Sequence, residues 1–311
     1  MGQFEDMGTF VRIIEAGSIS RAAEQLGVAK SAVSRRLVDL EGRLGVQLLN
    51  RTTRKSSLTE VGQSYYQHAL QILDDVNELN ATTSNSKAAL EGGLKIAVPL
   101  SFGLLHLTPV INAFTKEHPN LTIHLDFADR QTDLIEEGFD LAIRIAELKD
   151  SNHMARKLTP IRRVLCASPD YLERAGHPQT PEALKSHDIL HYDNAPRSSW
   201  TFIDSNAQKT RVNLPTKISA NNGDYLCEAA VAGFGLVVLP TFVAWREIEK
   251  GRLVHVMTEF GLPMLNAYAV YPQTRHLSRR VRAFIDFLID RFSGEPCWDK
   301  CLKASYNKKK S

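Results

Sequence analysis

The stretch "SRAAEQLGVAKSAVSRRL" (residues 20–37) contains two short helical patterns that meet at a Leu-Gly turn. Gly27 tolerates the left-handed backbone that a sharp turn between helices needs. Ser18 or Ser20 is a good N-cap for the first of the two helices. The second pattern begins with small polar residues and continues into two arginines. The stretch therefore predicts a helical corner whose second helix carries an exposed cationic face, and a preceding helix is expected from about Phe4 to Glu15.

The second helix of this corner has one apolar side and one polar side. At 100° per residue, four apolar side chains form a narrow buried stripe, namely Val33, Leu37, Leu40 and Leu44. The opposite side presents Ser31, Arg35 and Val38, with Ser34 on a flank and Lys30 in the first turn. Small side chains let a helix enter the major groove of DNA, and arginine reaches guanine edges or phosphates. The alternative is an ordinary amphipathic helix with a solvated basic face.

Positive charge is concentrated around this helix. The whole chain carries a net charge of only +3, but seven basic residues and two acidic ones lie between Lys30 and Lys55, which gives +5 there. The strand-like pair Leu48-Leu49 leads into a polar, basic loop over residues 50–57. Such a loop is typical of the wing of a winged helix, where Arg51, Arg54 and Lys55 would lie over the DNA backbone or the minor groove.

From Gly93 onward the pattern changes to alternating strands and helices, which is typical of an α/β unit. Strands are expected in "LKIAVP", "LTIHLDF", "DLAIRI", "RRVLCASP", "LVVLP" and "MLNAYAVYP". Helices are expected over 133–138, in "TPEALKS" after Pro181, and over 278–292. Two strand crossings, near 163–167 and 266–271, would make two subdomains with a cleft between them. The end, residues 294–311, is rich in lysine and is expected to be a frayed basic tail.

Several function classes find no support in the sequence. No apolar run is long enough to span a membrane, and the N-terminus has no signal-peptide core, so a cytoplasmic protein without membrane contact is expected. The four cysteines fit a reducing compartment, and Cys297 and Cys301 have no nearby partner for a metal site. The "GFG" at Gly233–Gly235 follows a helix and precedes a strand, the reverse of a dinucleotide fingerprint. We therefore expect no enzyme, no cofactor and no metal, and a transport binding protein is disfavoured.

The segment "GSISRAAEQLGVAKSAVSRRLVDLEGRLGVQLLNRTTRKSSLTEVG" resembles the DNA-binding domain of LysR-type transcriptional regulators. The likeness includes Ser34-Arg35, Leu40-Glu41, Leu44-Gly45, Leu58-Thr59 and Gly62. Many members have serine at the position of Ala29, where it caps the recognition helix, and glutamine at the position of Lys30. Without that cap the helix start is expected to be weaker by roughly 1 kcal/mol, unless Ser31 or a phosphate replaces it. The expected DNA contacts are Ser18, Lys30, Ser31, Ser34, Arg35, Arg36, Arg51, Arg54 and Lys55.

Residues 59–84 read as one longer helix with Thr59 as N-cap, and an apolar three/four repeat marks one side of it: Tyr66, Ala69, Leu70, Leu73 and Val76. The alternative to helix pairing is that this stripe packs on the chain's own effector domain. The resemblance implies that the helix forms a homodimer, with a homotetramer as the larger assembly. It also implies double-stranded DNA as partner, with RNA polymerase as a further candidate.

The second half contains the stretches "VPLSFG", "EEGFDLAIRI", "LCASPDYLERAG" and "AVAGFGLVVLP". On these stretches it resembles the effector domain of the same family, itself similar to periplasmic binding proteins. The implied site is the cleft between the subdomains, and its candidate residues are Ser101, Phe102, Arg144, Trp200, Asn221 and Asn222. Each has another reading. Ser101 could cap its helix, Arg144 could pair with a nearby carboxylate, Trp200 could be core, and the two asparagines could build a turn. If Arg144 and the helix termini converge, the hypothesis is an anionic effector such as a small carboxylate.

The sequence thus predicts a winged helix-turn-helix domain (1–58), all-α apart from its wing, a linker and dimerisation helix with its connector (59–92) and an α/β effector domain (93–293). Subdomain I would comprise about 93–163 and 270–293, subdomain II about 164–269, and a basic tail would follow over 294–311. The predicted function is a DNA-binding transcription regulator whose effector changes DNA binding or promoter output.

Overall fold

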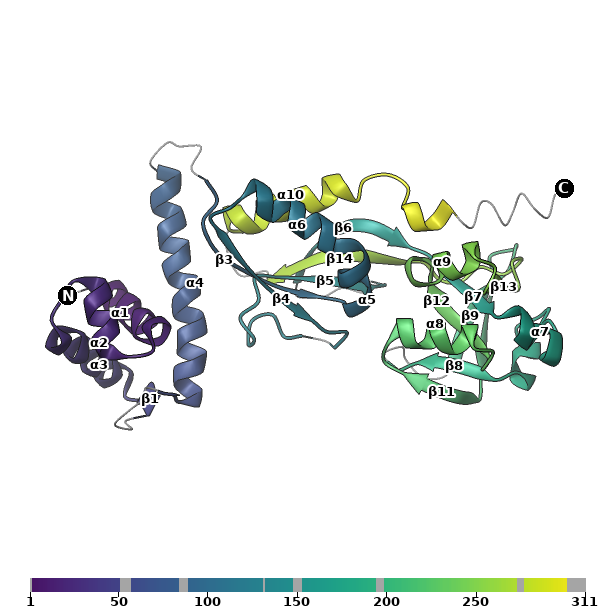
Figure 1. The fold of residues 1–311 in the computed structure, drawn as a ribbon, viewed down its shortest axis with the longest axis horizontal. Helices are drawn as coiled ribbons and strands as arrows, with labels where there is room; N and C mark the ends of the chain where they lie inside the picture. Colours follow the sequence, from purple (N-terminus) through teal and green to yellow (C-terminus); the bar gives the residue numbers. More distant parts are fainter. Residues whose placement is uncertain are drawn as a thin grey trace. The chain divides into compact units, whose positions relative to one another are not determined.

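The computed structural model describes residues 2–50, 57–83, 89–130, 132–147, 153–193, 199–272 and 277–300. The chain divides into two compact units, one formed mainly by residues up to Gly92 and the other mainly by residues from Gly93 onward. Figure 1 shows their helices and strands, with labels where there is room. The fold class predicted from the sequence is confirmed: a helical N-terminal unit precedes an α/β unit that contains two sheets.

Three helices and a two-stranded hairpin form the head of the first unit: α1 (Gln3–Ala16), α2 (Ile19–Leu26), α3 (Lys30–Leu44), β1 (Leu49–Asn50) and β2 (Ser57–Leu58). Gly17 and Gly27 end α1 and α2 in the left-handed conformation, with φ of 71° and 65°. Their turns allow the three helices to share one core, which includes Phe10, Ile13, Ala22, Val33, Leu37 and Leu40. The predicted helical corner is therefore present.

Two apolar residues of the head differ from the sequence prediction. The apolar spacing of the first helix predicts Phe4 and Ile14 on its buried stripe, but Phe4 in the first turn is 53% exposed and Ile13 is the fully buried residue. Leu44, expected in the buried stripe of α3, is 38% exposed because α3 ends there. Glu41, one turn earlier, is buried instead, and its carboxylate bonds to the backbone.

The helix α4 (Glu60–Thr83) follows the hairpin directly. Thr59 caps it as predicted, since its Oγ1 accepts a hydrogen bond of 2.9 Å from the amide of Gly62. Ala69 is fully buried against Met7 and Val11 of α1, and the ring of Tyr66 lies edge-on to Phe10. Part of the predicted apolar stripe of α4 therefore packs on the head of its own chain.

The second unit contains two five-stranded sheets. The first has the order β4 (Leu121–Phe127), β3 (Gly92–Val98), β5 (Leu141–Ala146), β14 (Leu265–Pro272) and β6 (His153–Ile161). The second has the order β11 (Thr216–Ala220), β8 (Ile189–Tyr192), β12 (Leu236–Pro240), β7 (Arg163–Ala167) and β13 (Val254–His255). β3 pairs parallel with β5, and β8 pairs parallel with both β11 and β12. A separate antiparallel hairpin joins β9 (Ser199–Ile203) and β10 (Lys209–Asn213).

The chain passes from one sheet to the other close to the predicted positions. β6 belongs to the first sheet and β7 to the second, with only Arg162 between them. The return passes through residues 256–264, before β14 rejoins the first sheet. The helices are α5 (Leu100–Phe102), the π-helix η1 (Gly103–Leu107), α6 (Thr108–Glu117), α7 (Pro169–Ala175), α8 (Gly223–Val231), α9 (Thr241–Glu249) and α10 (Arg279–Arg291).

Of two predicted helices, one is absent and the other is a short 3₁₀ turn. The segment 133–138 is a turn, because the Asp133 carboxylate takes up the amides of Ile135 and Glu136 and Gly138 then adopts φ 66°. After Pro181 the chain forms only the single 3₁₀ turn η2 (Glu182–Ser186).

The expectation of a frayed tail from residue 294 is wrong for the part up to Lys300. The 3₁₀ turn η3 (Cys297–Asp299) places Trp298 and Asp299 in the interior, with exposed fractions of 3% and 1%. Residues 301–311 lie outside the described ranges.

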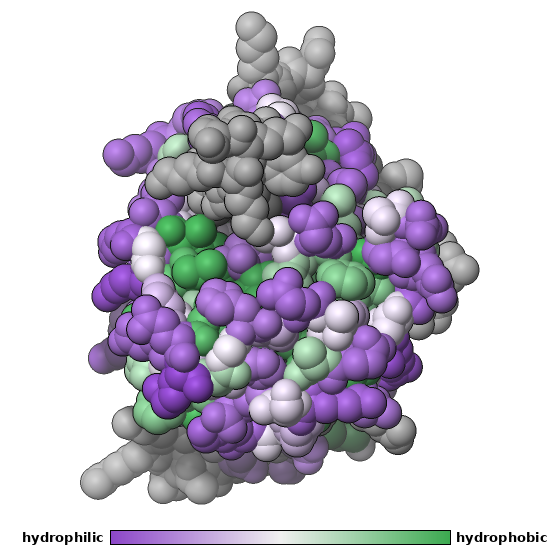
Figure 2. All heavy atoms as spheres, turned by 90° about the vertical axis from the view of Figure 1, so that its right-hand side faces the viewer, coloured by the Kyte–Doolittle hydropathy of each residue, from purple (hydrophilic) through white to green (hydrophobic). Residues whose placement is uncertain are grey.

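One face of the molecule is mixed in polarity. Figure 2 shows one face, on which hydrophilic residues dominate and hydrophobic residues gather in small groups. None of the helices in the described ranges has the length and hydropathy that a membrane span requires.

Candidate functional site

The leading face of α3 is open to solvent. Lys30, Ser31, Arg35 and Val38 are exposed, and Ser34 on the flank is half-buried. The inward residues Val33, Leu37 and Leu40 fix this orientation, because they are buried in the core of the head. The helix thus presents short polar groups, one guanidinium, one ammonium and an apolar methyl pair along one side. This chemistry matches what the major groove of DNA offers: acceptors, phosphates and thymine methyl groups.

The start of α3 has no side-chain cap, as expected from Ala29 at the N-cap position. The first amides of a helix carry partial positive charge and form a favourable place for a phosphate. In α2 the corresponding role is filled by Ser18, whose Oγ accepts a hydrogen bond of 3.2 Å from the amide of Arg21. A DNA contact by Ser18 stays a prediction.

The two neighbouring arginines of α3 differ in their surroundings. Arg35 is exposed, whereas the Arg36 side chain is 25% exposed and its Nη1 donates to Thr9 Oγ1 at 3.2 Å. Arg36 Nη2 also lies 3.6 Å from the carboxylate of Glu5. Arg36 therefore connects α3 to α1. Its role as a DNA contact stays a prediction, and its Nη1 and Nη2 are already engaged by Thr9 and Glu5.

A buried carboxylate joins α3 to the hairpin. Glu41 Oε1 accepts hydrogen bonds of 2.8 Å from the amide of Leu48 and of 3.2 Å from the amide of Leu49. The wing begins at Leu49 and returns at Leu58, which pair antiparallel. Sequence reasoning noted Glu41 only as part of a motif, although an acidic residue between apolar helix positions was a visible signal. The predicted wing contacts Arg51, Arg54 and Lys55 lie outside the described residues.

In the second unit, Ser101 reaches the start of α8. Ser101 is buried, and its Oγ donates a hydrogen bond of 2.6 Å to Asp224 Oδ2 in the first turn of that helix. Asn222 caps α8 by accepting 2.8 Å from the amide of Tyr225. The structure therefore brings Ser101 together with the α8 N-terminus, and effector binding by these residues stays a prediction. Asp224, which sequence reasoning missed, supplies the anion at this point.

The remaining effector residues predicted from the sequence are Phe102, Arg144, Trp200 and Asn221, and each lies in a different environment. Phe102, a candidate residue of the cleft, is instead fully buried among aromatic rings that include Phe242. The Arg144 guanidinium donates to the carbonyl of Thr132 at 2.5 Å. Trp200 packs on the hydrophobic core of the second sheet, and Asn221 is exposed beside the cap of α8.

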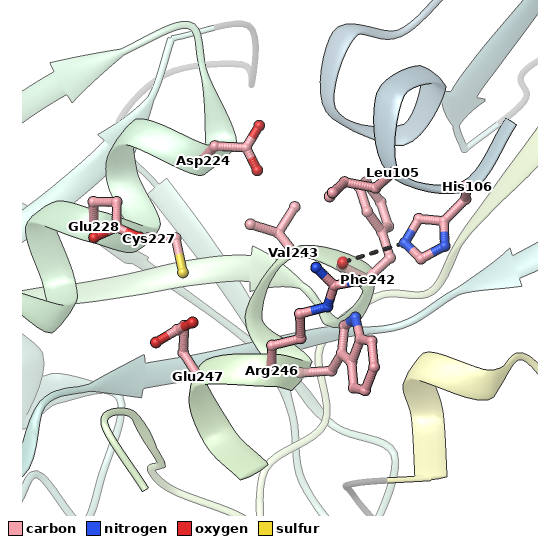
Figure 3. A pocket seen from close by; sticks show the side chains of 10 residues that line it. Leu105, His106, Asp224, Cys227, Glu228, Phe242, Val243, Arg246 and Glu247 are labelled. Carbon is pink, nitrogen blue, oxygen red and sulfur yellow. Dashed lines mark hydrogen bonds between the residues drawn. The ribbon is translucent and has the colours of Figure 1, made fainter. Parts of the chain in front are cut away.

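A cavity of about 150 Å³ lies where η1 faces α8 and α9, and Figure 3 shows its side chains. The residues that line it are Leu105, His106, Asp224, Cys227, Glu228, Phe242, Val243, Trp245, Arg246 and Glu247. None of the six residues predicted from the sequence is among them, although Ser101 bonds to one. Drug-sized ligand sites are commonly about 300–1,000 Å³, so this cavity in its present form fits only a small molecule.

Three carboxylates and one guanidinium surround the cavity. The pKa of Glu247 is lowered, chiefly by its hydrogen bond with Arg252, which keeps this carboxylate charged. Burial lowers the pKa of His106 and raises the pKa of Cys227 to about 12, so both are neutral near pH 7. Because Arg144 does not join the cavity lining, the condition attached to the anionic-effector hypothesis is not met. Among the described residues, no group of three or more His, Cys, Asp or Glu side chains is arranged so that it could hold a metal ion.

The fold and these two sites define a class of protein: a winged helix-turn-helix DNA-binding unit joined to a two-subdomain small-molecule-binding unit. Comparison with known families agrees. The family model for the bacterial regulatory helix-turn-helix protein of the lysR family matches residues 4–63, and the model for the LysR substrate binding domain matches residues 87–293. The chain belongs to the LysR family of transcriptional regulators, DNA-binding proteins with a substrate-binding domain.

Several relatives cover almost the whole chain. An uncharacterized HTH-type transcriptional regulator of Haemophilus influenzae is 38% identical over 282 residues, covering 90% of this chain and 98% of the relative. The regulator CrgA of Neisseria meningitidis serogroup C is 34% identical over 295 residues, with coverage of 94% and 98%. The transcriptional activator TtdR of Escherichia coli K12 is 33% identical over 285 residues, covering 91% of this chain and 92% of TtdR.

Two solved structures are similar to this chain over almost its whole length. The structure of CrgA from Neisseria meningitidis has a TM-score of 0.59 at 33% identity, covering 93% of this chain and 99% of CrgA. The Vibrio cholerae virulence activator AphB has a TM-score of 0.58 at 26% identity, with the same coverage.

Proposed function

We propose that this regulator binds specific DNA sequences through α3 and the wing, and that a small-molecule effector in its second unit changes DNA binding or promoter output. The observation that carries the DNA-reading role is the exposed face of α3, where Ser31, Arg35 and Val38 stand opposite the buried stripe. Arg36 and Arg43 each pair with an acid of α1. The exposed cations of the leading face are therefore Lys30 and Arg35. The protein acts in the cytoplasm, where its DNA lies, without membrane contact.

We place the protein outside the enzymes, because its relatives are named transcriptional regulators. Its assembly is a homodimer through α4, with a homotetramer as the larger form, and RNA polymerase is a partner at the promoter. Leu73 and Val76 are only half-buried within the single chain, which leaves apolar surface on α4 for a second copy. Two copies would present two α3 helices to successive major grooves of a two-fold site.

Fluorescence anisotropy tests the DNA-reading role. Duplexes recovered from a random library by the full chain are compared with shuffled duplexes of the same composition. The proposal expects at least a tenfold preference for recovered duplexes, which Arg35→Ala reduces. Arg12→Ala is the control, because Arg12 is an exposed arginine of α1 that pairs with Glu15. Equal affinity of the full chain for both duplex sets would reject sequence-specific binding.

For the effector, we propose the cavity beside η1, α8 and α9. Two carboxylates at α8, Asp224 and Glu228, face one guanidinium, that of Arg246, so charge complementarity favours a small ligand with a positively charged group. Apolar contacts from Leu105, Phe242 and Val243 would hold its hydrocarbon part. An effector that binds one conformation better than another shifts the balance between them, which is how it would reach the DNA-binding unit.

A thermal-shift screen of small amines, amino acids and carboxylates against the full chain tests this site. Compounds that raise the melting temperature are measured again with Glu228→Gln, which lines the cavity, and with Glu249→Gln, an exposed acid of α9 outside the lining. The proposal expects amine-bearing hits whose shift is lost in Glu228→Gln and kept in Glu249→Gln. Hits restricted to carboxylates, or unaffected by Glu228→Gln, would reject a cation site here.

A further inference from the structure

The end of the described chain packs into the second unit at a junction of its two sheets. The match to the LysR substrate binding domain ends at residue 293, so the segment 294–300 lies beyond it. Two of its residues are nevertheless almost completely buried, Trp298 at 3% and Asp299 at 1% exposure. A buried aromatic residue and a buried carboxylate in adjacent positions are costly to place unless each has specific partners.

Trp298 fills a space between elements that belong to different sheets. Its ring centroid lies 4.3 Å from that of His106 in η1 and 5.8 Å from that of Phe102 in α5, both of which follow β3. It also lies 6.3 Å from the ring of Phe242 in α9, which follows β12 of the other sheet. The His106 ring also joins η1 to α9 directly, because its Nε2 lies 3.4 Å from the carbonyl oxygen of Phe242. This interaction is the dashed line in Figure 3.

Asp299 joins two further points. Its Oδ2 lies 2.5 Å from Arg162 Nη1, at the residue where the chain passes from β6 to β7. Its Oδ1 accepts a hydrogen bond of 2.7 Å from the hydroxyl of Thr241, the first residue of α9. The amide of Thr241 in turn donates to the carbonyl oxygen of Arg162 at 2.9 Å. Both carboxylate oxygens are thus used to tie the crossing strand to α9.

We propose that Trp298 and Asp299 form a C-terminal latch that fixes α9 against η1 and thereby sets the opening between the two sheets of this unit. They are positioning residues, because they reach the cavity only through other side chains. His106 and Phe242, which Trp298 contacts, line the cavity, and α9 supplies Val243, Arg246 and further lining residues. Release of the latch would widen the cavity and allow a larger range of distances between the two sheets. This inference goes beyond the proposed function, since it requires neither DNA nor effector.

The test measures the separation of the two sheets in the full chain by electron paramagnetic resonance. Spin labels are placed at Lys116→Cys in α6 and Glu173→Cys in α7, both exposed, with Cys297 and Cys301 changed to serine. Cys166 and Cys227 are buried and stay in place. Labelled chain is diluted with excess unlabelled chain, so that each assembly contributes one pair of labels.

The parent protein should give a narrow distance distribution. Asp299→Ala and Arg162→Gln, which remove opposite sides of the same contact, should each broaden it at least twofold. The control is Asp188→Asn, because Asp188 pairs with Lys217 at 2.7 Å on the surface of one subdomain. Far-UV circular dichroism establishes that each variant is folded, and Arg162→Gln decides the matter if Asp299→Ala does not fold. An unchanged width in either folded variant, or equal broadening in Asp188→Asn, would overturn the latch.

Discussion

The carboxylate of Glu41 in α3 accepts a hydrogen bond of 2.8 Å from the amide of Leu48, one residue before the first strand of the wing. The amide of Leu49 donates to the same oxygen at 3.2 Å. Because α3 and the wing are the two elements proposed to touch DNA, this buried contact sets the position of one relative to the other.

Glu41→Ala should therefore damage both stability and DNA binding. It leaves two buried amides without their acceptor, and such a loss costs about 1–3 kcal/mol for each group. Glu41→Gln keeps an oxygen acceptor and should be milder in both respects. Urea unfolding measures the stability, and the slope of log affinity against log salt measures phosphate contacts. A stable Glu41→Ala protein with an unchanged salt slope would contradict this role.

We expect the apolar side chain of Val38 to contact a thymine methyl group in the major groove. It is 50% exposed and lies two turns after Ser31 on the leading face of α3. In a duplex recovered by selection, thymine is replaced position by position with uracil, which lacks the methyl group. One replacement should weaken binding to the wild-type chain and have no further effect on Val38→Ala. If every uracil replacement is neutral for the wild-type chain, the methyl contact does not exist.

Substitution on α4 tests the proposed dimer. Val76 is half-buried in the single chain, and Val76→Glu would place a charge on apolar surface intended for a second copy. We expect the dissociation constant of the dimer, measured by sedimentation equilibrium, to rise at least tenfold. Gln63→Glu adds the same charge at an exposed position of the same helix and should leave the dimer intact. Equal behaviour of the two variants would remove Val76 from the interface.

Two histidines of the second unit should make stability fall in mild acid. Burial lowers the pKa of His106 and of His187 below the ordinary value of 6.5, so the unfolded chain binds protons more readily. Above pH 6.5 their stabilising contribution is fully present, and it is lost as the pH falls through the folded-state pKa. Thermal unfolding between pH 7.5 and 5 should show a loss that is reduced in His106→Gln and reduced further in the double variant with His187→Gln. A loss of equal size in wild type and double variant would assign it to other groups.

The sequence predicted the head accurately because its signals are local. Gly17 and Gly27 end helices with a conformation that glycine adopts readily, and the period of Val33, Leu37 and Leu40 fixes the inward side of α3. The exposed positions of Lys30, Ser31 and Arg35 follow from that period. Local pattern could not reveal that Arg36 bonds to Thr9, since these residues are far apart in the chain.

The candidate cavity was less predictable because it depends on contacts between distant segments. Ser101 follows a strand and Asn222 precedes a helix, and both positions can be recognised from the sequence. Asp224, which accepts the hydrogen bond of Ser101, has no sequence signal that distinguishes it from other acidic residues. Phe102 carries the same local signal as Ser101 and points the other way, into the aromatic core. The prediction of a frayed tail rested on its many lysines and did not take account of one large apolar side chain, Trp298, which is buried.

The central claim is that α3 reads the major groove, and methylation protection tests it most directly. Dimethyl sulfate modifies guanine N7 in the major groove and adenine N3 in the minor groove. With the full chain on a selected duplex, we expect protection of guanine N7 within the site. That protection should be lost at specific guanines for Arg35→Ala and kept for Arg12→Ala. Protection confined to adenine N3, or a guanine pattern that Arg35→Ala leaves unchanged, would contradict the account.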